Sequence, residues 1–392
     1  MSGVVIIGAG QAGAEAALSL RQFQYAEPVI VVGDEPTVPY SRPPLSKDFL
    51  LGTLPPEKLA LRAASAYERA GVSLRLGEAA VALDPASHTV TLASGERLLY
   101  DACIIATGSS ARRLPLPGAD LRGILTLRTW ADAKWLQGAL QPDARLAVIG
   151  AGYLGLEVAA SARKLGHDVT VIEAGPRILG RSASDLAARA LARRHEAEGV
   201  RLLLGLAPAG FAGGHDGRVR AVVMADGSEI GADVVVVSVG GVPATGIALA
   251  AGIHCGNGIT ADPDARTSAA DVYSIGDCAH WDAGDGRGHL RLESVQMASR
   301  GARAAAAAIA GQPRPAVKQP YFWSNQYNLR LQIAGWVPPG LATEDHLEGD
   351  PADAFWVTRS IDGKLLAVEA VNSPAEYIKG QQLIGQPLCL NA

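Results

Sequence analysis

The chain opens with short runs of β-branched residues that are followed by a glycine-rich turn and by helical spacing. Val4–Ile7 predicts a buried strand, and after the turn Gly8–Gly13 the apolar side chains recur at helical spacing. Val29–Val32 predicts the next strand, which ends close to Asp34 and Glu35. These segments predict one strand–helix–strand unit with parallel strands.

The same order of segments returns later in the chain, where Gly150 lies 142 positions after Gly8. Leu146–Ile149 predicts a strand, a helical stretch runs to about Leu165, and Val169–Ile172 predicts the following strand. A whole supersecondary pattern that repeats in this way indicates a duplication. We therefore expect an α/β fold with two Rossmann-like dinucleotide-binding domains.

The last part of the chain has a different pattern. From about Ala316 aromatic residues become frequent, although they are scarce elsewhere. Phe355–Arg359 and Leu365–Ala370 flank the turn Asp362-Gly363 and predict an antiparallel hairpin, and Ala375–Leu383 predicts a helix. The expected domains are a discontinuous first dinucleotide-binding domain over 1–107 and 240–315, a second over 108–239, and a small α+β C-terminal domain over 316–392.

Each strand that opens a unit is followed by a glycine triplet. The first glycine of such a triplet turns the chain, the second lets a pyrophosphate approach the backbone, and the third lets the helix pack on the sheet. The N–H groups that begin the helix then meet the phosphate. One triplet alone could be an ordinary turn, but each here opens a helix and has an acidic residue beyond it. The triplets are Gly8, Gly10 and Gly13, and Gly150, Gly152 and Gly155.

The acidic residue after each unit's second strand bears on the choice of coenzyme, because it accepts hydrogen bonds from the adenosine ribose. Asp34 or Glu35 has this position in the first unit, and Glu173 has it in the second. A carboxylate at Glu173 favours a free 2′-hydroxyl and repels a 2′-phosphate, which predicts NAD rather than NADP. Arg177 and Arg181 argue the other way, since either could reach a phosphate. The other residues expected at the second site are Tyr153, Leu154, Arg181 and Gly240.

Charge and hydropathy exclude several classes of partner. The formal net charge is −4, so no global basic field attracts nucleic acid. The longest apolar stretch, around Val234–Val237, falls far short of a membrane span. The N-terminus lacks the pattern of a secretory signal and the thiols are scattered, so we expect a cytoplasmic protein.

The cysteines are too far apart for a redox or metal motif. No pair has the C-x-x-C spacing of a catalytic dithiol, a zinc site or an iron–sulfur loop. We therefore expect no cluster, no metal and no catalytic disulfide. The four residues are Cys103, Cys255, Cys278 and Cys389.

Two sets of motifs carry a resemblance to known enzymes. The first set is Gly8–Gly13, Ala106–Gly108, Gly150–Gly155 and Tyr273–Asp277. It resembles the glutathione-reductase-like flavoproteins, which hold FAD in the N-terminal unit and a nicotinamide coenzyme in an inserted unit. The second, more specific set is Pro39–Lys47, Leu127–Thr129, Gly155–Glu157, Glu293–Val295 and Phe322–Gln326. It is similar to the NADH-dependent ferredoxin reductases of the putidaredoxin reductase and biphenyl dioxygenase ferredoxin reductase type, over nearly the whole chain.

The resemblance implies roles for individual residues. It implies that Arg42 and Trp323 line the flavin and that Glu157 lies beside the nicotinamide. Three departures from the family pattern bear on fine contacts with the cofactor, namely Ser41 for Asp, Ala80 for Val and Val242–Ala244 for Pro-Asn. The residues that the resemblance places against FAD are Ala12, Asp34, Lys47, Ala80, Arg128, Asp277 and Val295, with Ala106, Thr107, Gly108 and Gly276 in the surrounding motifs.

Lys47 and Glu157 are the expected catalytic residues. Hydride moves from nicotinamide C4 to flavin N5, so catalysis consists mostly of stacking the two rings. Lys47, held by the rigid Pro43-Pro44 segment, can donate to flavin N5 or O4 and stabilise negative charge. Glu157 can pair with Lys47 and accept from the carboxamide. Either residue alone would be read as a solvated charge, and the surrounding motifs favour the catalytic interpretation.

The missing cysteine pair determines where the electrons go. Disulfide reductases of this fold reduce a nearby dithiol, whereas here the electrons must leave through the flavin. A reduced flavin can release them singly to a separate [2Fe-2S] ferredoxin, and the resemblance implies that this ferredoxin serves a cytochrome P450 or a Rieske-type oxygenase. Six cations between Arg287 and Lys318 offer an acidic ferredoxin a docking face, or are simply a solvated helix face. Trp323 either shields the flavin or belongs to the C-terminal core.

Other functions remain open on the sequence alone. A rubredoxin or monodehydroascorbate-type reductase would differ in its acceptor and keep the same cofactor machinery. An NADH oxidase or peroxidase would need a reactive cysteine on the first helix, where the sequence has none. An apoptosis-inducing-factor-like NADH-sensing flavoprotein would dimerise with NADH, and the net charge of −4 argues against its binding nucleic acid.

Overall fold

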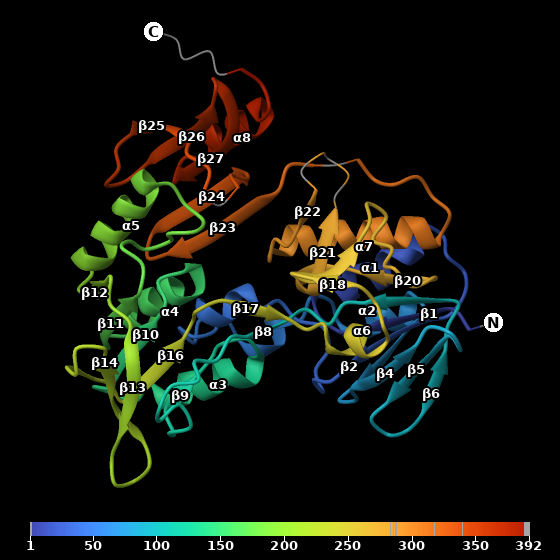
Figure 1. The fold of residues 1–392 in the computed structure, drawn as a ribbon, viewed down its shortest axis with the longest axis horizontal. Helices are drawn as coiled ribbons and strands as arrows, with labels where there is room; N and C mark the ends of the chain where they lie inside the picture. The colour runs from blue at the N-terminus through green and yellow to red at the C-terminus, as the bar shows by residue number, and fades with distance from the viewer. Residues whose placement is uncertain are drawn as a thin grey trace. The chain divides into compact units, whose positions relative to one another are not determined.

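The computed structural model describes residues 2–282, 284, 286, 288–316, 318–338 and 340–387. The chain forms two compact units, drawn in Figure 1. Each unit is assembled from segments that are distant in the sequence. Unit 1 consists of Met1–Ser41, Pro56–Ser110 and Val242–Lys318, and unit 2 consists of Arg42–Pro55, Ala111–Gly241 and Gln319–Ala392.

A five-stranded sheet with the order β20-β7-β1-β2-β3 forms the centre of unit 1, and all its neighbouring strands are parallel. Its central strand is buried along its whole length because both faces of the sheet are covered. This explains why these strands are apolar runs rather than alternating patterns. The strands are β1 (Val4–Ile7), β2 (Val29–Gly33), β3 (Val72–Leu76), β7 (Ala102–Ile105) and β20 (Val272–Ser274).

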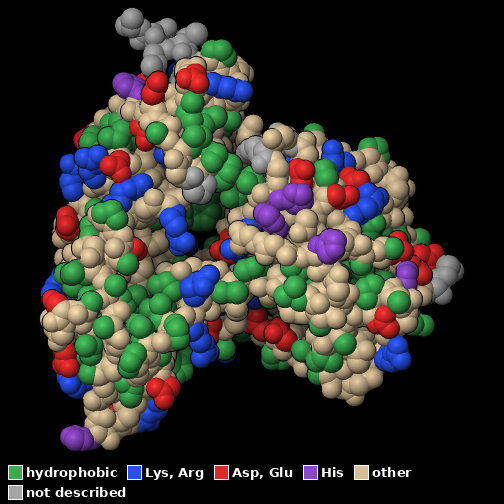
Figure 2. Space-filling view, viewed as in Figure 1, with side chains coloured by type: hydrophobic (Ala, Val, Ile, Leu, Met, Phe, Trp, Pro, Cys, Tyr) green, Lys and Arg blue, Asp and Glu red, His purple; other side chains and the backbone are tan. Residues whose placement is uncertain are grey.

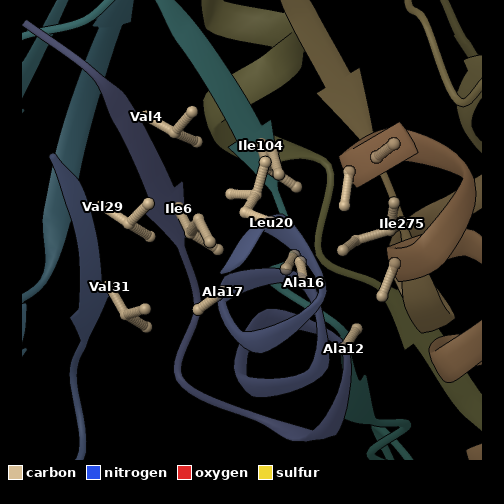
Figure 3. Packing of buried hydrophobic residues seen from close by; sticks show 14 of the residues in the cluster. Val4, Ile6, Ala12, Ala16, Ala17, Leu20, Val29, Val31, Ile104 and Ile275 are labelled. Carbon is tan, nitrogen blue, oxygen red and sulfur yellow. The ribbon is translucent and has the colours of Figure 1, made fainter. Parts of the chain in front are cut away.

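Two helices cover one face of this sheet, α1 (Gln11–Gln22) and α7 (Val295–Ile309). Figure 3 shows Ile6 of β1 beside Ala16 and Ala17 of α1. Ala16 is fully buried there, and the buried side of α7 also consists mostly of alanines. Such small side chains let two helices lie close together and against the strands.

The other face of the sheet packs against an antiparallel ribbon and a short helix, through the remaining side chains of β1, Val5 and Ile7. A further sheet has the order β18-β19-β21-β22. The remaining elements of unit 1 are η2 (Pro56–Leu59), α2 (Ala64–Arg69), β4 (Ala80–Asp84), β5 (Thr89–Leu92), β6 (Arg97–Leu99), α6 (Gly246–Ala250), β18 (Cys255–Gly256), β19 (Gly258–Ala261), η3 (Gly276–Cys278), β21 (Ala279–Asp282) and β22 (His289–Leu290).

Unit 2 contains the second parallel sheet, with the order β12-β11-β10-β16-β9. A three-stranded antiparallel ribbon, β13-β14-β15, completes this part of the chain. The elements are η1 (Pro43–Ser46), β9 (Ile124–Leu125), α3 (Trp130–Ala139), β10 (Arg145–Ile149), α4 (Tyr153–Lys164), β11 (Asp168–Glu173), α5 (Asp185–Ala197), β12 (Arg201–Leu204), β13 (Pro208–Gly213), β14 (Val219–Met224), β15 (Glu229–Gly231) and β16 (Val234–Val237).

The C-terminal part of unit 2 is a five-stranded antiparallel sheet, β23-β24-β27-β26-β25, with one helix. The predicted hairpin is present, and both residues of its turn, Asp362 and Gly363, have positive φ. The strands that begin at Tyr321, Leu329 and Glu344 were not predicted from the sequence. The elements are β23 (Tyr321–Gln326), β24 (Leu329–Gly335), β25 (Glu344–Gly349), β26 (Phe355–Ile361), β27 (Lys364–Val371) and α8 (Pro374–Leu383).

Two short paired strands, β8 (Ser109–Ala111) and β17 (Gly241–Pro243), lie where the chain passes between the units. Residues 42–55 belong to unit 2, whereas the limits expected from the sequence place them in the first dinucleotide-binding domain. The domain limits expected from the sequence stay predictions. The predicted fold class is confirmed, because two parallel Rossmann-like sheets and an antiparallel C-terminal sheet are present. Within the part of the chain that the structure describes, no helix has the length and apolar character needed to cross a membrane.

Replacing Gly13 with Ala should destabilise the protein, because a Cβ there would overlap the carbonyl oxygen of Gly8 and lie 3.3 Å from Ile6 Cγ2. We expect a loss of about 1–3 kcal/mol in the free energy of unfolding, measured by urea denaturation. Gly10→Ala is the matched control in the same turn, since no heavy atom lies within 4 Å of its added Cβ. Equal stability of the two variants would contradict this account of the turn.

Candidate functional site

The first glycine turn joins β1 to α1. Gly8 has a φ of +118°, and a Cβ there would overlap the Ala106 carbonyl oxygen. Gly10 precedes α1 without a side chain to cap it, and the first helical turn carries no acidic residue. An anion at this helix end would gain hydrogen bonds from the first N–H groups and a favourable interaction with the helix dipole. The turn therefore fits the pyrophosphate of a dinucleotide.

Other residues predicted to bind FAD gather at the carboxyl ends of the same parallel strands. Ala106–Gly108 follows β7, and Gly276 and Asp277 follow β20 in η3. A Cβ at Gly276 would lie 2.9 Å from the Cβ of Ala12, so this turn lies against the beginning of α1. The carboxyl edge of a parallel sheet is where this fold binds its ligands.

The remaining predicted FAD residues of unit 1 lie at the ends of other elements. Asp34 follows β2 and is exposed, whereas the carboxylate of Glu35 accepts a 2.6 Å hydrogen bond from the Tyr40 hydroxyl. Of these two acids, Asp34 therefore has its side chain in solvent. Ala80 is the first residue of β4, and Val295 is the first residue of α7.

Arg42 and Arg128 lie together in unit 2. A guanidinium nitrogen of Arg42 donates to the backbone oxygen of Arg128 over 2.6 Å. The next residue, Thr129, begins α3 through a capping box with Asp132. The motif Leu127–Thr129 therefore both starts a helix and presents a carbonyl group to Arg42.

The second glycine turn repeats the geometry of the first. Gly150 has a φ of +101°, and a Cβ at Gly155 would overlap the Gly150 carbonyl oxygen. Glu173 ends β11, and its carboxylate accepts a 2.7 Å hydrogen bond from the N–H of Ala151 within the turn. The acid therefore lies against the turn that would receive the coenzyme. The other predicted residues of this turn are Gly152, which precedes α4, and Tyr153 and Leu154, which begin it.

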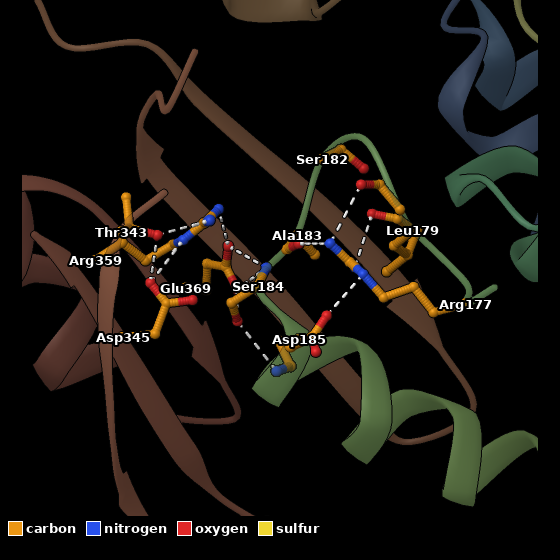
Figure 4. A network of polar contacts seen from close by, with 12 residues as sticks. Arg177, Leu179, Ser182, Ala183, Ser184, Asp185, Thr343, Asp345, Arg359 and Glu369 are labelled. Carbon is orange, nitrogen blue, oxygen red and sulfur yellow. Dashed lines mark hydrogen bonds and ion pairs between the residues drawn. The ribbon is translucent and has the colours of Figure 1, made fainter. Parts of the chain in front are cut away.

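Arg177 closes the loop that follows Glu173, as Figure 4 shows. Its guanidinium lies 2.7 Å from Asp185 and donates to four carbonyl groups of its own loop. The Arg177 guanidinium therefore serves to hold the conformation of this loop. Arg181 is exposed instead, and its guanidinium lies 3.6 Å from the position of a Cβ at Gly240. Of the two arginines, Arg181 is the one placed beside another predicted site residue.

The C-terminal sheet anchors the start of α5, also visible in Figure 4. Glu369 on β27 accepts hydrogen bonds from the backbone N–H of Ser184 at 2.9 and 3.0 Å and from its hydroxyl at 2.6 Å. Arg359 lies 3.2 Å from the same carboxylate. Burial raises the pKa of Glu369, and Arg359 and Ser184 oppose that rise. Sequence reasoning missed this network, and its one signal is a lone carboxylate in the apolar run of β27.

Lys47 and Glu157 form a buried ion pair. η1 ends just before Lys47, whose Nζ lies 2.5 Å from Glu157 Oε2 and 2.9 Å from the Pro43 carbonyl oxygen. The hydroxyl of Ser46 donates to the same carboxylate oxygen over 2.6 Å. Glu157 is only 5% exposed. The pairing predicted from the sequence is confirmed, and a buried carboxylate is stable only when it is paired and hydrogen-bonded in this way.

β23 supplies the other contact to Glu157. The Ser324 hydroxyl donates to Glu157 Oε1 over 2.7 Å. The preceding residue, Trp323, is half-buried, and its ring centroid lies 6.5 Å from that of Phe322 and 6.2 Å from that of Tyr321. Neighbouring residues of a strand face opposite sides, so Ser324 and Trp323 serve different surroundings. Sequence reasoning missed Ser46 and Ser324 as contacts, although both lie inside the motifs that carry the resemblance.

Several of the basic residues between 291 and 318 have local partners in unit 1. Arg291 pairs with Glu293, and Arg314 lies 3.6 Å from Asp264. Figure 2 shows cationic and anionic side chains interspersed on the visible face of this unit. Arg287 lies outside the described residues. These pairings favour the interpretation of this segment as a solvated face.

The cysteines of unit 1 are unsuited to a redox role. Burial raises the pKa of the Cys103 and Cys278 thiols, which keeps them protonated and poorly nucleophilic. All three cysteines in the described part of the chain, Cys255 included, are free, and Cys389 lies outside it. Across that same part, no group of three or more His, Cys, Asp or Glu residues is arranged to hold a metal ion.

Comparison with known proteins adds independent evidence. Residues 2–302 match the pyridine nucleotide-disulphide oxidoreductase family, and residues 321–392 match the reductase C-terminal domain. A probable ferredoxin reductase, CtmF, of Castellaniella defragrans is 43% identical and covers 97% of this chain and 93% of its own length. The ferredoxin–NAD(+) reductase component of the biphenyl dioxygenase system of Paraburkholderia xenovorans is 38% identical, with 99% and 94% covered.

A solved structure agrees over nearly the whole chain. The reductase in the covalent putidaredoxin reductase–putidaredoxin complex superimposes with a TM-score of 0.94 at 34% identity, covering 98% of this chain and 93% of that chain. The chain therefore belongs to the pyridine nucleotide-disulphide oxidoreductase family, whose members bind FAD and NAD(P), and is a flavoprotein oxidoreductase with a reductase C-terminal domain.

Proposed function

We propose that the protein is an NADH-dependent ferredoxin reductase. It takes hydride from NADH onto FAD and passes electrons singly to a [2Fe-2S] ferredoxin, which serves a cytochrome P450 or a Rieske-type oxygenase. Full-length similarity to reductases of oxygenase systems supports the proposal. The observation that carries its chemistry is the buried Lys47–Glu157 pair and the two hydroxyl groups that bond to it.

Unit 1 is proposed to hold FAD. The first glycine turn would take the pyrophosphate, Asp34 the adenosine ribose, and Asp277 the ribitol hydroxyls. When bound, FAD supplies a ring that accepts hydride at N5 and gives up electrons one at a time. The other proposed FAD contacts are Ala80, Ala106–Gly108, Val295, Arg42, Arg128 and Trp323.

Lys47 and Glu157 are proposed to do the catalytic work of the chain. Lys47 has a fixed direction, because Glu157 and the Pro43 carbonyl oxygen hold its ammonium group. A positioned cation of this kind stabilises negative charge that develops on the flavin. Glu157 would accept a hydrogen bond from the nicotinamide carboxamide and so orient the ring for transfer.

NADH is proposed as the electron donor in preference to NADPH. The Glu173 carboxylate lies against the second glycine turn, where it can accept hydrogen bonds from free ribose hydroxyls. A 2′-phosphate at that place would meet a negative charge. Arg177, the nearer of the two arginines in sequence, already bonds to its own loop.

A one-electron acceptor and a cytoplasmic location complete the proposal. The thiols of Cys103 and Cys278 are buried and protonated, which disfavours electron transfer through them. Electrons would therefore pass directly from the flavin to the external carrier. Free thiols in the described residues fit a reducing compartment.

Anaerobic titration of the FAD-loaded protein tests this function. We expect NADH to bleach the flavin absorbance roughly tenfold or more faster than NADPH, because of the charge at Glu173. A candidate [2Fe-2S] ferredoxin added afterwards should be reduced, as a reporter haem protein would register. Equal rates with NADPH would overturn the assignment of Glu173. Failure with every ferredoxin, but turnover with rubredoxin or monodehydroascorbate, would replace the proposed acceptor.

Lys47→Met should slow NADH-dependent flavin reduction by about a hundredfold, since it removes a charge-stabilising donor. Stopped-flow absorbance measures the rate, and the dependence on NADH concentration separates it from binding. Lys164→Met is the matched control, because Lys164 is an exposed lysine on the same helix as Glu157 and donates to the Tyr327 backbone oxygen. A rate within a factor of about two of the control would remove Lys47 from the mechanism.

Trp323→Ala should slow electron transfer to the acceptor by roughly threefold or more and affect NADH-dependent flavin reduction less, if the indole shapes the exit path. The two half-reactions are measured separately by stopped flow. Tyr321→Ala, which removes an exposed aromatic neighbour on the same strand, is the control. Equal loss in both half-reactions would mean that Trp323 is part of the packing of the C-terminal domain.

A further inference from the structure

The carboxylate of Glu157 is the inner end of a continuous chain of hydrogen bonds through buried side chains of unit 2. Ser324 Oγ lies 2.7 Å from Glu157 Oε1, and Gln326 Nε2 lies 3.1 Å from Ser324 Oγ. His195 Nε2 lies 2.8 Å from Gln326 Oε1, and the Tyr327 hydroxyl lies 3.3 Å from His195 Nδ1. The three middle residues are almost inaccessible, since Ser324, Gln326 and His195 are 0%, 3% and 1% exposed.

The direction of each bond follows from the carboxylate outward. A carboxylate can only accept, so Ser324 must donate its hydroxyl proton to Glu157. The Ser324 oxygen is then an acceptor for Gln326, which must present its NH₂ group to it. The amide oxygen of Gln326 consequently faces His195, and the bond between them exists only if His195 carries a proton on Nε2.

The charge and the tautomer of the His195 imidazole ring follow from its surroundings. Burial lowers the pKa of His195, although Gln326 and Glu198 act in the opposite direction, so the ring is neutral at pH 7. A neutral ring with a proton on Nε2 has an acceptor at Nδ1, to which the Tyr327 hydroxyl donates. The ring of Tyr327 meets the imidazole edge-on, with centroids 5.1 Å apart.

Every donor in this series of hydrogen bonds therefore points toward Glu157. Lys47 and Ser46 bond to Oε2, and Ser324 bonds to Oε1. A carboxylate has about four lone-pair positions, and these donors fill three of them. Among the described residues the remaining position is on Oε1, the oxygen to which Ser324 bonds, and a carboxamide N–H group would use this position.

We propose that His195 is a positioning residue for the reaction with NADH, acting through Gln326 and Ser324 to aim Oε1 of Glu157 at the nicotinamide carboxamide. The inference rests on the proposed function and extends it to a residue on a different helix, α5. In this proposal His195 acts only through the side chains to which its ring bonds, Gln326 and Tyr327. Its Nε2–H group donates to the amide oxygen of Gln326 and so helps to keep the Gln326 NH₂ group turned toward Ser324, whose hydroxyl donates to Glu157.

Two substitutions at position 195, to Gln and to Asn, distinguish a hydrogen-bonding role of His195 from a role in packing. Gln places its side-chain NH₂ near the position of histidine Nε2, whereas Asn places its NH₂ near Nδ1. We expect His195→Asn to slow NADH-dependent flavin reduction in the FAD-loaded protein by roughly fivefold and His195→Gln to retain most of the rate. The substitution His167→Asn is the control, because His167 is also buried in unit 2 and its Nδ1 has no hydrogen-bond partner among the described residues.

The kinetic outcomes each decide the question. Equal slowing by Asn and Gln at position 195 would mean that the ring matters only for packing, and wild-type rates in both would deny it any role. If NADH does not reduce the flavin of the wild-type protein, the proposed function itself is overturned. That result is obtained before any variant is made. Thermal unfolding of all three variants shows whether a slow rate reflects loss of folding.

Nuclear magnetic resonance supplies a readout that does not depend on activity. Long-range ¹⁵N–¹H spectra of the FAD-loaded protein should contain the signal of a neutral ring protonated on Nε2 at pH 7 that disappears in the His195 variants, which assigns it to His195. Ser324→Ala should shift this signal, because it removes the acceptor of Gln326. A ring at position 195 that is protonated on Nδ1 or charged at pH 7 would overturn the inference.

Discussion

The buried negative charge of Glu157 brings together several segments of unit 2. Glu157 is 5% exposed, and an unpaired carboxylate at such a place would cost several kcal/mol. The chain meets this cost with a cation from the segment after η1, with hydroxyl groups from η1 and β23, and with the fixed position of α4 that carries the acid. The Arg42–Pro55 segment and the C-terminal sheet are therefore held around one carboxylate.

Much of this architecture could be predicted because its signals are local. The β-branched runs before Gly8 and Gly150 identify buried parallel strands, and each glycine turn follows from close approaches that any side chain would obstruct. The hairpin at Asp362-Gly363 follows from a turn that needs positive φ. The Lys47–Glu157 pair could be anticipated because both residues lie in motifs whose resemblance to ferredoxin reductases brings them to one site.

The contacts that complete the site could not be predicted, because they join residues far apart in the sequence. Ser46 and Ser324 lie 111 and 167 positions from Glu157, and His195 lies 131 positions from Gln326. β23 also escaped prediction for a physical reason. Its buried positions are the polar Ser324 and Gln326, whereas the aromatic Tyr321 is exposed, so its alternation is the reverse of an ordinary half-buried strand.

By sequence order, the helix α5 belongs to the second dinucleotide-binding domain. The C-terminal sheet nevertheless forms hydrogen bonds near both of its ends, from Glu369 to Ser184 and from Gln326 to His195. Replacing the C-terminal domain of one reductase with that of another would thus leave polar groups without partners, unless all four of these residues were kept compatible with one another. Recombination between such enzymes is accordingly constrained at a junction that looks, along the chain, like a simple boundary between modules.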